Sequence, residues 1–129
     1  MQKTRVLDVG NCDPDHGSIR ALLLANFEVE IDRVMFVDEA LAALRQCDYG
    51  LVLVNRLIFA DSSDGMELIH KMRADANCRS PVMMVSNFAD AQERAVAAGA
   101  LPGFGKAAIG AAATLERLAS VLPRKSGTK

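Results

Sequence analysis

"YGLVLVNRLIF", residues 49–59, contains an apolar run from Leu51 to Val54 that stops at two polar residues, Asn55 and Arg56. The run has the length and composition of a strand that is buried on both faces. A polar residue at the carboxyl end of such a strand lies where alternating α/β proteins place their ligands and their chemistry. An amide at this position can bind a ligand, but it cannot act as a nucleophile.

Outward from this strand, apolar runs of strand length alternate with segments of helical periodicity. Five strand–helix units predict a parallel sheet with helices on both faces and right-handed crossovers. Gly99 is predicted to cap the end of the fourth helix, and Pro123 to end the fifth. The predicted strands are 5–10, 28–34, 51–54, 82–86 and 101–104, and the predicted helices are 17–25, 38–47, 65–76, 90–98 and 109–122.

Length and composition restrict the classes of protein that fit. The 129 residues, half of them hydrophobic, predict one domain over 1–122 and a flexible, solvated C-terminal tail over 123–129. A net charge of −1 predicts no general affinity for nucleic acid or an anionic membrane. No apolar run reaches the roughly 18 residues of a membrane span, and residues 1–9 lack the apolar stretch of a signal peptide, so a cytoplasmic location is expected.

Polar residues follow four of the predicted strands, where the loops of a parallel sheet converge at one edge. We therefore expect their side chains to meet. They are Asn11, Cys12, Asp13 and Asp15 after the first strand, Asn55 and Arg56 after the third, Ser86 and Asn87 after the fourth, and Lys106 after the fifth.

Four stretches of the chain resemble, in order, the motifs of the response-regulator receiver domain of bacterial two-component signalling. They are "YGLVLVN" (49–55), "DGMELIHKMRA" (64–74), "PVMMVSNFADAQERAVAAGA" (81–100) and "GFGK" (103–106). The resemblance covers about 5–122. It implies the flavodoxin-like, CheY-like fold, a five-stranded parallel (βα)5 sheet with helices on both faces.

The resemblance places Asn55 where a working receiver has the aspartate that accepts a phosphoryl group from a histidine kinase. An amide oxygen is a poor nucleophile, so Asn55 is not expected to be phosphorylated. The paired acids that hold Mg²⁺ in the family fall on Asn11 and Cys12, or on Gly10 and Asn11 if the register shifts by one. Neither choice supplies two carboxylates. With Asp13 alone, weak or absent Mg²⁺ binding and no cofactor are expected.

The residues that read out phosphorylation are only partly retained. Ser86 and Lys106 match the family's hydroxyl residue and its phosphate-binding lysine, but Ala107 replaces the usual proline, so no cis bond is expected there. Gly103 stands where the family has an aromatic switch residue. Phe104 could substitute, although strand alternation should turn it toward the core.

Structural roles are expected for most of these polar residues. Asn55 is predicted to hydrogen-bond loop amides, and Lys106 to form an ion pair with Asp13. Ser86 is predicted to bond backbone at the strand end.

The histidines and cysteines lack the spacing of a catalytic or metal site. His16 and His70 are predicted to lie on the solvated surface. Reduced thiols are expected, because three cysteines, Cys12, Cys47 and Cys78, are an odd number without metal-ligand spacing. Cys12 is predicted to be buried and inert, and a reactive thiolate near Lys106 is the alternative.

Two other classes of protein match parts of the sequence. Asp8-Val9-Gly10 resembles the opening of the glycine-rich turn of S-adenosylmethionine methyltransferases, but Cys12 and Pro14 occupy positions where that turn needs glycine. A flavodoxin-type electron carrier needs aromatic residues to enclose its flavin, and the chain has no tryptophan and one tyrosine.

The sequence thus favours a non-enzymatic, phosphorylation-independent receiver-like module, or pseudo-receiver, that acts through protein contacts. The family commonly uses the fourth helix, fifth strand and fifth helix for dimers and partners, which here corresponds to 90–122. A protein partner or a homodimer is expected on that face.

Overall fold

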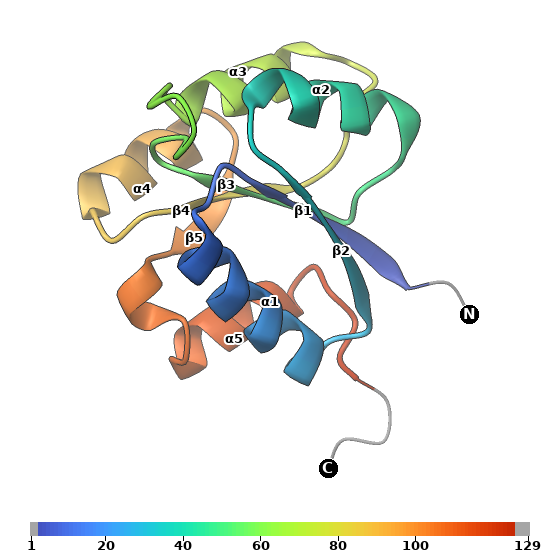
Figure 1. Cartoon of the computed structure of the whole chain (residues 1–129), viewed down its shortest axis with the longest axis vertical. Helices are drawn as coiled ribbons and strands as arrows, with labels where there is room; N and C mark the ends of the chain where they lie inside the picture. Colours follow the sequence, from blue (N-terminus) through green and yellow to red (C-terminus); the bar gives the residue numbers. More distant parts are fainter. Residues whose placement is uncertain (1–2, 126–129) are drawn as a thin grey trace.

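The computed structural model describes residues 3–125, in which five parallel strands form one sheet with the order β2-β1-β3-β4-β5 (Figure 1). Each predicted strand is present, with boundaries that differ by at most one residue. The strands are β1 (Thr4–Val9), β2 (Val29–Val34), β3 (Leu51–Asn55), β4 (Val82–Val85) and β5 (Leu101–Phe104).

Five helices connect or follow the strands, and the largest differences from prediction are at the first and last. They are α1 (Asp13–Asn26), α2 (Val37–Gln46), α3 (Met66–Ala74), α4 (Ala89–Ala97) and α5 (Ala112–Ala119). Helix α1 begins four residues before the predicted start, because Pro14 occupies a first-turn position where its missing N–H is not needed. The predicted fifth helix, 109–122, is shorter at both ends in the structure, and a short 3₁₀ turn, Lys106–Ala108, precedes α5. Gly110, a poor helix former, lies between them.

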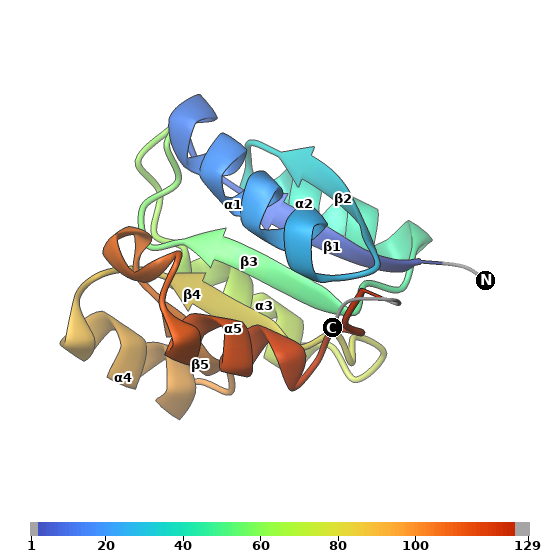
Figure 2. The same cartoon turned by 90° about the horizontal axis from the view of Figure 1, so that it is seen from below.

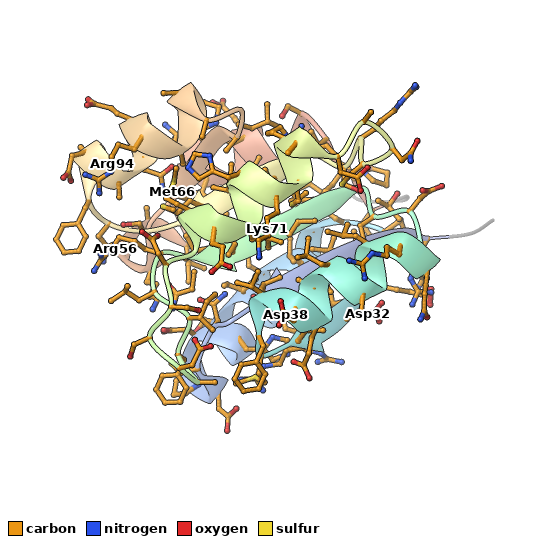
Figure 3. All side chains as sticks on the ribbon, turned by 90° about the horizontal axis from the view of Figure 1, so that it is seen from above. Asp32, Asp38, Arg56, Met66, Lys71 and Arg94 are labelled. Carbon is orange, nitrogen blue, oxygen red and sulfur yellow. The ribbon has the colours of Figure 1, made fainter. Side chains whose placement is uncertain are left out.

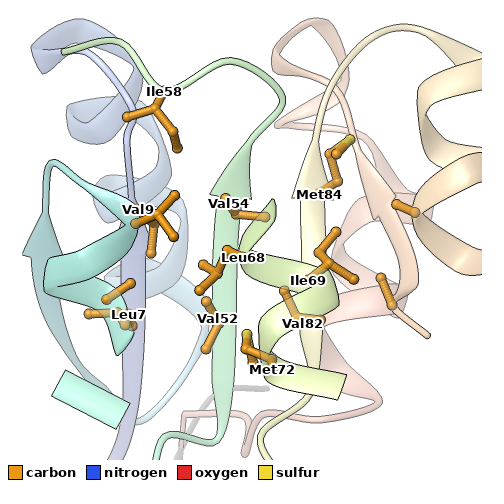
Figure 4. Close-up of a cluster of buried hydrophobic side chains, with 14 of the residues drawn as sticks. Leu7, Val9, Val52, Val54, Ile58, Leu68, Ile69, Met72, Val82 and Met84 are labelled. Atoms are coloured by element: carbon orange, nitrogen blue, oxygen red, sulfur yellow. The ribbon is translucent and has the colours of Figure 1, made fainter. Parts of the chain in front are cut away.

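The helices form two layers, with α1 and α5 on one face of the sheet and α2, α3 and α4 on the other (Figures 1 and 2). Strands β1, β3 and β4 are buried on both faces, as predicted. On the α2–α4 face, Val9, Val52 and Val54 pack with α3 residues such as Ile69 and Met72 (Figure 4). The opposite face buries Ile19 and Leu23 of α1 and Leu118 of α5, among others.

The predicted end of α4 is confirmed, whereas α5 ends at Ala119, before the predicted stop at Pro123. Gly99 has a φ of 111° and follows α4, as a C-cap glycine should. Arg124 forms an antiparallel bridge with Phe27, and the Lys125 N–H donates to the Asn26 carbonyl, so 123–125 run beside the end of α1. The rest of the predicted tail, 126–129, lies outside the described residues, and the domain boundary at 122 stays a prediction.

Within residues 3–125, no helix is long and apolar enough to cross a membrane.

Candidate functional site

The loops after β3, β4 and β5 meet at the carboxyl edge of the sheet and line a small, open cavity of about 230 Å³. Asn55, Ser86 and Lys106 all line it, as the convergence of strand ends predicts. Asn11, Cys12 and Asp13 do not line it. The predicted site residues therefore separate into two neighbouring groups.

Asn55 uses its amide as a hydrogen-bond donor. Its Nδ2 donates to the Leu57 carbonyl oxygen at 2.7 Å and to the Gly10 carbonyl oxygen at 3.4 Å. The expectation that Asn55 bonds loop amides is therefore wrong, because the loops after β1 and β3 turn carbonyls, not N–H groups, toward it. An aspartate could not donate to these two oxygens.

Two glycines allow the loops around Asn55 to approach one another. A Cβ on Gly65 would lie 2.1 Å from the Asn55 carbonyl oxygen, so only glycine fits there. Gly10 has a φ of 77°, and its carbonyl oxygen also accepts a bond from the Phe59 N–H. The backbone thereby fixes the Asn55 side chain from both sides.

Asp8, one residue before the carboxyl end of strand β1, is fully buried and bonded to the loop that follows it. Its carboxylate accepts from Asn11 Nδ2 at 2.5 Å and from His16 Nδ1 at 2.5 Å. The prediction that His16 is on the solvated surface is wrong, because the early start of α1 places His16 over β1. Sequence analysis did not select Asp8. The signal was an acid inside an apolar strand, which must find donors when it is buried.

The remaining charges of the β1 loop are paired across the molecule. Arg33 on β2 forms an ion pair with Asp13 Oδ1 at 2.8 Å and donates to the Asn11 carbonyl at 2.8 Å. Lys106 pairs with Asp15 at 2.6 Å. The predicted Lys106–Asp13 pair is therefore wrong, because Asp13 is taken by the arginine on the edge strand β2.

Asp15 also joins Cys12 to this network. The Cys12 thiol donates to Asp15 Oδ2 at 3.1 Å. The bond from Lys106, with a smaller contribution from Cys12, lowers the pKa of Asp15 although partial burial opposes the shift. Cys12 is partly exposed rather than buried, and it is free, as are Cys47 and Cys78. His70 is exposed, as predicted.

The residues at the family's metal positions do not fit Mg²⁺ in this arrangement. Asn11 points its Nδ2 at Asp8, Cys12 offers a thiol, and Asp13 is paired with Arg33. A hard dication needs several oxygen ligands. Over the described part of the chain, no three histidine, cysteine or acidic residues gather into a group that could hold a metal ion.

Gly103, which the resemblance places at the family's switch position, is closely enclosed by its neighbours. A Cβ there would lie 2.1 Å from the Met84 carbonyl oxygen. Gln92 of α4 reaches between β4 and β5. Its Nε2 donates to the Met84 carbonyl at 2.8 Å and the Ser86 carbonyl at 3.2 Å, and its Oε1 accepts from the Gly103 N–H at 3.0 Å. Phe104 is buried, as strand alternation predicted.

Gln92 therefore bridges the place where the β4–β5 register is irregular. Sequence analysis missed this residue, because a glutamine in a helix carries no pattern that predicts a bond to two strands.

Ser86 and Asn87 organise the end of β4. The Ser86 hydroxyl oxygen accepts from the Phe88 N–H at 3.1 Å, which confirms the predicted bond to backbone. Asn87 Oδ1 accepts from the Ala107 N–H at 3.1 Å and so holds the turn that carries Lys106. Among the described residues every peptide bond, including the one before Ala107, is trans.

Arg56 completes the cavity at the outer edge of the molecule, between the β3–α3 loop and α4 (Figure 3). Its guanidinium lies 5.1 Å from the centre of the Phe88 ring, in a cation–π contact. A stacked guanidinium keeps the N–H groups at its edges available for other partners.

Solved response-regulator structures share this fold. A putative response regulator from Chloroflexus aurantiacus J-10-fl has a TM-score of 0.74 at 17% identity, over 93% of this chain and 98% of that one. The chemotaxis response regulator CheY4 of Vibrio cholerae has a TM-score of 0.70 at 18% identity, over 94% and 100%. NtrX from Brucella abortus has a TM-score of 0.66 at 20% identity over 81% of this chain, which spans only 23% of NtrX.

No protein-family model matches the sequence, and no curated protein matches it. The fold is thus that of the receiver domains, with the flavodoxin-like, CheY-like sheet that the sequence predicted.

Proposed function

We propose that this chain is a pseudo-receiver, a member of the receiver family that signals through protein contacts and without phosphorylation. The observation that carries the proposal is the role of Asn55, which stands at the acceptor position and donates its amide to two carbonyl oxygens. A neutral amide held as a donor is not a nucleophile toward phosphorus.

The β1 loop supports the same proposal. Asn11, Cys12 and Asp13 correspond to the family's metal ligands, and each is engaged with a group of the chain itself. We therefore propose weak or absent Mg²⁺ binding, no cofactor and no enzymatic activity. A cytoplasmic location is part of the proposal, since two-component signalling is the context of the family.

The proposed partner surface is the face formed by α4, β5 and α5, within 90–122. It carries an open groove of about 600 Å³, lined by residues that include Val96, Ala97, Pro102 and Arg117. Val96 is 42% exposed. A mostly apolar groove with few charges suits a protein partner or a second copy of the chain, and it offers no basic surface for nucleic acid.

The S-adenosylmethionine alternative gains no support. The Asp8 carboxylate, which would open the ligand turn, is buried and bonded to Asn11 and His16. The similar structures described above are response regulators.

Intact-mass spectrometry after incubation with acetyl phosphate and Mg²⁺ tests the proposal. Wild type and Asn55→Asp are both expected to keep their mass, because the variant still lacks the metal ligands. A receiver domain with its acceptor aspartate serves as the positive control. A phosphorylated wild-type species, mapped to Asp13, Asp61 or Asp64, would overturn the proposal, and efficient modification of Asn55→Asp would show that the metal site works.

A further inference from the structure

The small cavity at the carboxyl edge is lined by hydrogen-bond donors that have capacity to spare. The Ser86 oxygen accepts from the Phe88 N–H, which leaves its hydroxyl proton for another acceptor. Asn87 uses only its Oδ1 within the described residues. Lys106 pairs with Asp15 and has three N–H donors in all. Arg56 contacts the Phe88 ring through the face of its guanidinium.

The lining of this cavity carries positive charge, and the Asp15 carboxylate pairs with Lys106 from outside it. Two of its lining residues, Arg56 and Lys106, are cations, and none of the described residues that line it carries a carboxylate. At the family's acceptor position the chain has the neutral Asn55. An anion entering here would meet two cations and two neutral donors, so its desolvation would be compensated by charge-assisted hydrogen bonds.

The size and the rim of the cavity restrict the occupant. A volume of about 230 Å³ is below the roughly 300–1,000 Å³ of small-molecule pockets, and it suits the head of one side chain. Two lining residues expose apolar surface at its mouth, since Phe88 is 57% exposed and Leu57 is 43% exposed. A free inorganic anion would leave these side chains in water, whereas a peptide would cover them.

We infer that this cavity binds the carboxylate side chain of an acidic residue in a protein partner, with apolar neighbours of that residue covering Leu57 and Phe88. The inference deepens the proposed function and rests on it, because a phosphoryl group on residue 55 would fill the same cavity. It defines a second contact surface, separate from the α4–β5–α5 face, and assigns it a ligand chemistry.

The test is an NMR titration of the ¹⁵N-labelled full chain with two blocked tripeptides, acetyl-Leu-Asp-Leu-amide and acetyl-Leu-Asn-Leu-amide. The aspartate peptide is expected to shift the backbone amide signals of Ser86, Phe88 and Ala107 with a saturable Kd on the order of 1 mM. The asparagine peptide is expected to bind at least five-fold more weakly. Sodium phosphate at matched ionic strength is the third arm.

Variants locate the effect. Arg56→Gln and Lys106→Met are each expected to weaken binding of the aspartate peptide at least three-fold. Lys71→Met, which removes a cation from α3 outside this cavity, is expected to leave binding unchanged. The spectrum of each variant reports whether it is folded, and Arg56→Gln keeps the test decisive if Lys106→Met does not fold.

Three outcomes would overturn the inference. Equal binding of both peptides would mean that the apolar rim binds without the carboxylate. Tighter binding of phosphate than of the aspartate peptide would indicate a site for free anions. Absence of saturable shifts at the three amides would exclude the site, even if acetyl phosphate leaves the protein unmodified, so this failure is distinguishable from a failure of the proposed function.

Discussion

At the carboxyl edge of the sheet, the loop after β1 differs from the loops after β3 and β4 in how far its polar groups are hydrogen-bonded within the chain. In the first region the carboxylates are bound within the chain: Asp8 by Asn11 and His16, and Asp13 by Arg33. In the second region Arg56, Ser86 and Asn87 keep unused donors around a cavity. The first region, from Asp8 to Asp13, is closed by internal pairs, and the second, around Arg56, Ser86 and Asn87, is open.

The difference follows from the sign of the charges and from burial. A buried carboxylate such as Asp8 must be hydrogen-bonded, because leaving it unpaired would cost several kcal/mol. Arg56 and Lys106 are partly exposed, so water can solvate their unused N–H groups until a partner arrives. The carboxylates of the first region are thus bonded internally, whereas the cations of the second keep N–H groups that water can solvate.

Asn11→Asp, in the closed region, is the substitution expected to lower the stability of the fold most. It would place a second carboxylate against Asp8, at the position where Asn11 Nδ2 now donates over 2.5 Å. Two like charges in a fully buried site should destabilise the fold by about 3–5 kcal/mol, the cost of an uncompensated buried charge. Urea unfolding measures the loss. Asn77→Asp, the same chemical change at an exposed position, is the control and should have little effect.

Millimolar Mg²⁺ sharpens this prediction. The urea midpoint of wild-type unfolding should not change with Mg²⁺, since the carboxylates of the closed region are already paired within the chain. If the wild-type midpoint rises with Mg²⁺ but not with a monovalent salt of equal ionic strength, the region binds a divalent cation and is not closed.

Gln92→Ala tests the hydrogen bonds that join β4 and β5 beside the open region. It would leave the Gly103 N–H and the Met84 carbonyl without their bonds from the glutamine, at a cost of about 1–3 kcal/mol. Urea unfolding gives the loss, and faster hydrogen exchange at the Gly103 amide would localise it. Glu93→Ala, an exposed neighbour on α4, is the control. A loss no larger than that of the control would mean that the glutamine does not stabilise the β4–β5 pair.

Lys106→Met has the smallest expected effect, because it removes the pair that joins the two regions at a partly exposed site. The Lys106 bond lowers the pKa of Asp15 below its value in the unfolded chain. The pair therefore stabilises the fold above about pH 3.8, and this contribution is lost as the pH falls through the lowered pKa. At pH 7 the variant should be less stable by about 0.2–1 kcal/mol.

Urea unfolding of wild type and Lys106→Met at pH 7, 5 and 3 checks the sign. The difference between the two proteins should be smaller at pH 3 than at pH 7. Asp15→Asn and the double variant complete a thermodynamic cycle that isolates the pair. A difference that persists undiminished at pH 3 would show that Lys106 stabilises the fold by some other contact.

Much of the candidate site was predictable because it depends on where strands end. The apolar run 51–54 fixed the place of Asn55, and parallel strands bring Ser86 and Lys106 to the same edge. The side-chain partners were not predictable in the same way. Asp13 and Asp15 are two residues apart at the start of α1, yet one pairs with β2 and the other with the turn after β5.

By itself, the sequence determined the order of strands and helices along the chain, the burial of β1, β3 and β4, and the absence of a nucleophile at residue 55. These properties depend on local periodicity, turn residues and the chemistry of single side chains. Only the tertiary structure decided that Asp8 binds His16, that Gln92 bridges β4 and β5, and that the donors around Arg56 face a cavity. Such pairings depend on the direction in which each element points its side chains, and that direction is set when distant segments pack together.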